Sequence, residues 1–166
     1  MENYVKVVLY AYPLLKSVEE GYAEHIKNKA LLSYNSSMTA ENLAVYLAEE
    51  IIRKNKLSWL KGVVEKVVKK LNAEEQTLLS VRYFGKRRVA SKAKNTPMVE
   101  SERQYFRRQS RLSEKVAAML KSEGLTEERY KREYSTLDIF EKVKKYVERR
   151  EKKELSDKNA RKADGF

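Results

Sequence analysis

The chain has 166 residues, of which 36% are charged and 42% hydrophobic, and its formal net charge is +12. Five glycines and two prolines are too few for a turn-rich β fold, so the composition favours an all-α protein of long amphipathic helices. The sequence has no cysteine, which excludes disulfides and thiolate metal sites, and a reducing cytoplasm is the expected compartment.

The first segment, residues 3–33, has two local interpretations. Val5 to Tyr12 is rich in β-branched and aromatic residues and precedes Pro13, which is typical of a strand. The sequence offers no second convincing strand, however, and a helical stripe continues across the proline. A long helix kinked near Pro13 is therefore expected. The apolar run from Val5 to Leu15 lacks a basic leader and is too short to span a bilayer, so we expect neither a signal peptide nor a membrane anchor.

A second helical stripe runs from Leu43 to Leu71, either as one helix or as two that join at residues 53–56, and Thr39 is the expected N-cap. Two long helices with a short connection pack antiparallel. The two stripes therefore predict a long helical hairpin over residues 1–71.

Positive charge is concentrated in one later segment, residues 82–111. This segment holds ten cations against two anions, whereas the first 81 residues hold eleven cations against ten anions. Such a concentration is typical of a protein that binds a phosphate backbone. A basic surface that contacts only solvent is the alternative.

Within this segment, residues 101–120 predict a helix with a core face and a basic face. Ser101 occupies the N-cap position, and Gln104 can complete a capping box three residues later. The core face is expected to hold Tyr105, Phe106, Leu112, Val116, Met119 and Leu120. The basic face is expected to hold Gln104, Arg107, Arg108, Arg111 and Lys115.

Asn72 and Glu75 form a second capping signal, which opens a predicted helix that ends before Gly85. The stretch from Leu71 to Phe84, with its acidic pair, its Leu-Leu and its Arg-Tyr-Phe, resembles the opening helix of region 4 of bacterial RNA polymerase sigma factors. The helix that begins at Ser101 resembles the closing recognition helix of that region. Similar arrangements occur in phage-type late-gene regulators and in small proteins of Gram-positive bacteria.

The resemblance covers about a third of the chain and implies a helix-turn-helix-like unit over residues 72–124 of a DNA-binding transcription regulator. The first turn of the Ser101 helix would approach a groove, where arginine can contact guanine and glutamine can contact adenine. The candidates for contacts with base edges or phosphates there are Arg103, Gln104, Arg107 and Arg108. The candidate DNA-binding residues are Lys86, Arg87, Arg88, Lys92, Lys94, Ser101, Arg103, Gln104, Arg107, Arg108 and Arg111.

The segment between the two helices departs from the family pattern. Region 4 has a short supporting helix there, whereas in the stretch from Lys86 to Pro97 only Val89, Ala90 and Ala93 could form an apolar face. A degenerate supporting helix or a basic loop is expected, whose cations contact phosphates.

The C-terminal part, residues 125–156, predicts two further helices. Thr126 can cap the first, which ends near Tyr134, and Ser135 with Asp138 can cap the second, which continues to about Glu154. Residues 157–166 are polar and are expected to form a disordered tail.

No pattern of catalytic or cofactor chemistry is found, because the sequence has no glycine-rich phosphate loop, no nucleophile elbow and no zinc spacing. We therefore expect neither an enzyme nor a cofactor. His25, the one histidine, is interpreted as structural or exposed rather than as a metal ligand. Five carboxylates are interpreted as solvated faces of the hairpin, namely Glu19, Glu20, Glu24, Glu49 and Glu50.

Four aromatic residues near the two sigma-like helices have two interpretations. They are expected to pack these helices together, and the alternative is a stacking platform for single-stranded bases. The four are Tyr83, Phe84, Tyr105 and Phe106.

Together these observations favour a regulator that binds duplex DNA and whose hairpin self-associates or contacts a partner such as RNA polymerase. A protein-interaction module that has lost DNA reading is one alternative, and an RNA-binding protein is another. No metal and no membrane partner are expected.

Overall fold

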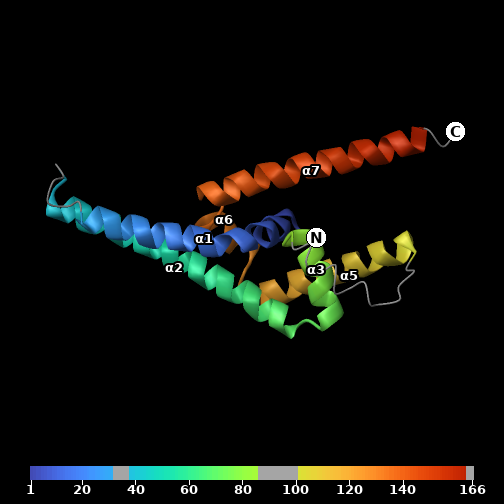
Figure 1. The fold of residues 1–166 in the computed structure, drawn as a ribbon, viewed down its shortest axis with the longest axis horizontal. Helices are drawn as coiled ribbons and strands as arrows, with labels where there is room; N and C mark the ends of the chain where they lie inside the picture. The colour runs from blue at the N-terminus through green and yellow to red at the C-terminus, as the bar shows by residue number, and fades with distance from the viewer. Residues whose placement is uncertain (32–37, 86–100, 164–166) are drawn as a thin grey trace.

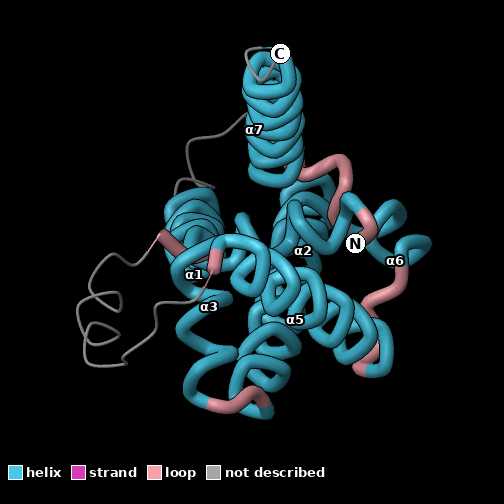
Figure 2. Tube along the Cα trace, turned by 90° about the vertical axis from the view of Figure 1, so that its right-hand side faces the viewer, coloured by secondary structure: helices cyan, strands magenta, loops and turns pink. Residues whose placement is uncertain are grey.

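The computed structural model describes residues 1–31, 38–85 and 101–163. Over these ranges the chain is all-α, as predicted, with six helices and no strand (Figure 2). The helices are α1 (Asn3–Leu31), α2 (Ala40–Lys70), α3 (Ala73–Tyr83), α5 (Glu102–Ser122), α6 (Glu127–Glu133) and α7 (Asp138–Ala163).

The predicted N-terminal hairpin is confirmed. Helices α1 and α2 lie side by side along most of their lengths, and α7 runs beside α1 on another side (Figure 1). Helix α1 continues through Pro13, and α2 is one helix across residues 53–56. The strand interpretation of Val5 to Tyr12 is therefore wrong.

The first turns of α1 are buried on nearly all sides, which explains their strand-like composition. Val5, Val8, Leu9 and Ala11 each have 0% of their surface exposed. A helix that is hydrophobic all round is a core helix, because every face needs an apolar neighbour. β-Branched side chains are tolerated there since tertiary packing outweighs their modest helix propensity.

Aromatic contacts join this buried part of α1 to three other helices. Tyr10 lies 4.9 Å, between ring centroids, from Tyr83 of α3 and 5.7 Å from Tyr146 of α7. Tyr4 lies 5.7 Å from Tyr130 of α6, and burial raises the pKa of the Tyr130 hydroxyl to about 12. Edge-on and tilted ring pairs of this kind add to the free energy of area burial. Helices α3, α6 and α7 are thereby positioned against one central element.

The predicted helix ends are largely confirmed. Thr39 and Thr126 each accept a hydrogen bond from the backbone N–H three residues later, and Asn72 and Ser101 form complete capping boxes with Glu75 and Gln104. Gly85 and Gly124 have positive φ angles of 63° and 96°. Glycine adopts these angles without the steric penalty of a side chain, which is why both helices end there.

Two C-terminal predictions are wrong. Helix α7 runs to Ala163, so residues 157–163 are helical rather than a disordered tail. Their low hydrophobicity suggested disorder, but lysine, arginine and alanine are good helix formers that can extend an exposed helix. Ser135 also does not cap α7, since its hydroxyl donates to the Lys131 carbonyl of the preceding helix at 2.6 Å.

Two of the five hairpin carboxylates are not solvated. Glu50 is 7% exposed and pairs with Arg53 one turn later. Glu19 accepts hydrogen bonds from Lys61, at 2.6 Å, and from the Ser58 hydroxyl, and these bonds lower the pKa of its carboxyl. Glu19 therefore joins α1 to α2, a role that the charge pattern did not indicate.

Over the described ranges, none of the helices combines the length and the hydrophobicity that crossing a bilayer requires.

The Glu19 contact predicts a dependence of stability on pH. The folded carboxyl has a lowered pKa, so its contribution is present above the ordinary value of 4.5 and is lost as the pH falls through the folded value. We expect Glu19→Gln to cost about 1 kcal/mol of unfolding free energy at neutral pH and progressively less below about pH 4.

Urea titrations over a pH series measure this difference. Glu20→Gln is the matched control, because Glu20 is the exposed neighbour on the same helix. A cost that is equal in both variants, or that persists at low pH, would contradict the assignment.

Candidate nucleic-acid interface

Helix α5 begins where the sequence predicted it. The Ser101 hydroxyl accepts the Gln104 backbone N–H, and the Gln104 side-chain oxygen accepts the Ser101 backbone N–H, both at 3.3 Å. Two of the four backbone donors that a helix start leaves unpaired are satisfied in this way. The capping box therefore defines the first turn of α5.

The buried face of α5 fixes the direction of its arginines. Gln109, Leu112, Val116 and Leu120 are the buried residues of this helix, and they recur at helical spacing. The side-chain amide of Gln109 donates to the Leu78 carbonyl of α3 at 3.4 Å and to the Tyr105 hydroxyl at 3.2 Å. The opposite face of α5 must therefore point away from the core.

Three arginines four residues apart lie on that opposite face. Arg103, Arg107 and Arg111 are exposed, and among the described residues no carboxylate lies within ion-pair distance of them. Residues four apart on a helix are neighbours, so the three side chains form one line. We call Arg103, Arg107 and Arg111 the arginine stripe.

Arg108 differs from the stripe because an acidic side chain of α3 covers it. Its guanidinium lies 2.7 Å from the Glu74 carboxylate. Lys115, one of the predicted basic-face residues, donates to both oxygens of Glu75 at 2.8 and 3.0 Å, and this bond lowers the pKa of the Glu75 carboxyl. Arg108 and Lys115 therefore join α5 to α3.

Gln104 is exposed, but its side-chain oxygen is already used in the capping box. A bidentate contact to adenine uses both the oxygen and the nitrogen of the amide. The predicted adenine contact would therefore compete with the bond that begins the helix.

The remaining candidates, Lys86, Arg87, Arg88, Lys92 and Lys94, lie outside the described residues, as does the segment of the predicted supporting helix.

The four aromatic residues separate into two groups. Tyr83 is buried and Phe84 half-buried, and their rings lie 4.9 Å from those of Tyr10 and Tyr12 on α1, so they pack α3 on α1 rather than on α5. Tyr105 is half-buried, whereas Phe106 is 53% exposed. The prediction that Phe106 belongs to the core face of α5 is wrong.

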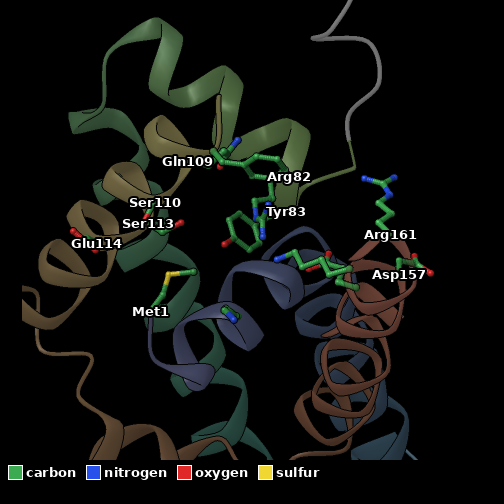
Figure 3. Close-up of a pocket in the computed structure, with 13 residues that line it drawn as sticks. Met1, Arg82, Tyr83, Gln109, Ser110, Ser113, Glu114, Asp157 and Arg161 are labelled. Carbon is green, nitrogen blue, oxygen red and sulfur yellow. The ribbon is translucent and has the colours of Figure 1, made fainter. Parts of the chain in front are cut away.

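A cavity of about 460 Å³ lies beside Phe106, between α5 and the C-terminal part of α7. Figure 3 shows Arg82 and Tyr83 of α3 between Ser110 of α5 and Arg161 of α7. This site was not predicted from the sequence. Arg82 belongs to the basic segment but had no assigned role, and the lining residues Lys158 and Arg161 belong to the expected tail.

The described residues contain no group of three or more side chains that could hold a metal ion. Comparisons of the chain with protein-family models, with curated proteins and with solved structures find no match. The interface is therefore interpreted from its own geometry.

The capping box generates a stability prediction. Ser101→Ala removes the acceptor of the Gln104 N–H and should lower the free energy of unfolding by about 1 kcal/mol. Urea denaturation followed by circular dichroism measures the change. Ser110→Ala is the control, because Ser110 is exposed in the middle of the same helix and alanine there should be neutral or slightly stabilising. Equal effects in both variants would contradict a capping role.

Proposed function

We propose that this protein is a DNA-binding regulator that contacts the phosphates of duplex DNA through the arginine stripe of α5. The observation that supports the proposal best is that these three guanidinium groups are exposed and that no carboxylate of the described residues lies within ion-pair distance of them. Breaking an internal ion pair to free a cation costs free energy, so cations without internal partners bind phosphate at the lowest cost.

The way in which α3 and α5 pack also supports this proposal. Gln109 on the buried face of α5 and Lys115 beside it join the two helices, which leaves the first turns of α5 free on their outer side. In helix-turn-helix proteins the N-terminal residues of the recognition helix contact the groove while another helix supports it. The resemblance to sigma region 4 assigns the same roles to the same two helices.

Within this proposal, base reading is expected to be limited. Arg108 is engaged with Glu74, and Gln104 is engaged in the cap, so two of the four residues predicted to approach bases have internal partners. Phosphate contacts supply affinity and register but carry no sequence information. We therefore expect mainly electrostatic binding, with Arg103 and Arg107 as the candidates for base contacts.

The proposal includes a partner surface on the hairpin. Helix α2 exposes Val45, Ile51 and Ile52 at 59%, 44% and 52%. We propose that these side chains contribute to a surface for self-association or for contact with RNA polymerase. Sedimentation at micromolar protein concentration tests self-association. A monomeric protein would exclude self-association and favour the contact with RNA polymerase.

Salt-dependent DNA binding tests the proposal. With fluorescently labelled duplex DNA, the slope of log K against log salt should become shallower by about 2 to 3 when Arg103, Arg107 and Arg111 are all changed to glutamine. The matched control changes Lys16, Lys27 and Lys145 to glutamine, which removes the same charge from exposed positions on α1 and α7.

Two outcomes would contradict duplex DNA binding. The first is the absence of binding by the unaltered protein at low salt, or binding that salt does not weaken. The second is an equal change of slope in the stripe variant and in the control, which would indicate a nonspecific effect of net charge. Stronger binding to structured RNA, or binding only to an acidic protein, would favour the corresponding alternative.

A further inference from the structure

We infer that the cavity between α5 and α7 takes one unpaired nucleotide of the DNA that the arginine stripe binds, with the base stacked on Phe106. The inference rests on the proposed function and adds a preference for DNA that has an unpaired base. Three observations support it: the exposure of Phe106, the cations that line the cavity, and the short spacing along α5 between Phe106 and the arginine stripe.

Phe106 has the exposure of a contact residue. Its side chain is 53% exposed, although α5 buries leucine and valine elsewhere along its length. Its nearest aromatic neighbour among the described residues is Tyr105 of the same helix, with ring centroids 5.8 Å apart and the planes at 72°. A ring that is half exposed and whose aromatic neighbour is tilted rather than stacked can stack on a base, and every base offers a π-face.

The charges around the cavity suit a phosphate group. Lys6 and Glu154 line it but pair with Glu151 and Arg150. Of the other charged lining residues, Glu114 and Asp157 are acidic, whereas three are cations that no described carboxylate pairs with: Arg82, Lys158 and Arg161. The three cations come from two helices, so they can surround an anion rather than line one side of it.

The size of the cavity limits what can enter. A volume of about 460 Å³ lies within the range of sites that hold small molecules, so one nucleotide can fit but a stacked duplex cannot. The base must therefore be unpaired or leave the helix. Extruding a base costs least where it is already unpaired, for example in a bulge.

Phe106 and the arginine stripe contact the same strand in this arrangement. Phe106 lies three residues after Arg103 and directly before Arg107, at the border between the stripe and the buried face. Side chains three apart on a helix are neighbours. A nucleotide next to the phosphates on the stripe is therefore within reach of the Phe106 ring.

The test compares two short duplexes of the same sequence, one intact and one with a single bulged 2-aminopurine. The protein should bind the bulged duplex roughly fivefold to a hundredfold more tightly, and stacking should quench the fluorescence of the 2-aminopurine. Phe106→Leu should remove the preference and the quenching, whereas Phe106→Trp should retain both, because leucine keeps the apolar volume but not the π-face.

A second pair of variants tests the phosphate contact. Arg161→Gln should reduce the preference for the bulged duplex, and Lys162→Gln is the control, because Lys162 is the exposed neighbour of Arg161 and does not line the cavity. Titration with AMP tests whether a free nucleotide is the ligand instead. Release of the bulged duplex by micromolar AMP would overturn the assignment to a nucleotide of bound DNA.

Failure of this inference is distinguishable from failure of the proposed function. Salt-dependent binding of the intact duplex, with no advantage for the bulge or with the advantage retained in Phe106→Leu, overturns the inference and leaves the proposed function intact. Loss of salt-dependent binding to both duplexes overturns the two together.

Discussion

The burial of the first turns of α1 on nearly all sides is the constraint on which the rest of the structure depends. An apolar helix without an exposed face needs neighbours in every direction, and α2, α3, α6 and α7 supply them. Tyr10 contacts both Tyr83 of α3 and Tyr146 of α7, so a single side chain of α1 helps to position both helices. The N-terminal turns of α5 and the C-terminal turns of α7 point toward the same end of the molecule (Figure 1), and residues of both helices line the cavity.

Several acidic side chains of the described residues pair with cations outside the stripe. Glu123 accepts from Lys66 and Lys70, which lower the pKa of its carboxyl, and thereby holds the end of α5 against α2. Exposed pairs of this kind contribute little to stability. Their larger consequence is electrostatic, because each paired carboxylate contributes less negative potential near the stripe.

Features set by short-range interactions could be predicted from the sequence, and features set by tertiary neighbours could not. The Asn72 and Ser101 capping boxes join residues three apart, so the local sequence was sufficient. The exposure of Phe106 depends on where α7 passes, and the burial of Glu50 depends on how α1 and α2 pack. Residues 157–163 are helical although they bury no apolar face, so their low hydrophobicity did not distinguish an exposed helix from a disordered tail. Five of the eleven predicted site residues lie outside the described residues, namely Lys86, Arg87, Arg88, Lys92 and Lys94.

The neighbours of Phe106 explain why this side chain differs from the other apolar residues of α5. Leu112, Val116 and Leu120 belong to the hydrophobic core, whereas the part of α7 that reaches the Phe106 end of α5 presents Asp157, Lys158 and Arg161 to the cavity. Charged side chains cannot close an apolar gap without losing hydration, so the space between the two helices stays open and polar. An aromatic ring that borders such a space gains little from burial by its own chain, and a ligand with both a flat ring and an anionic group could use the two surfaces together.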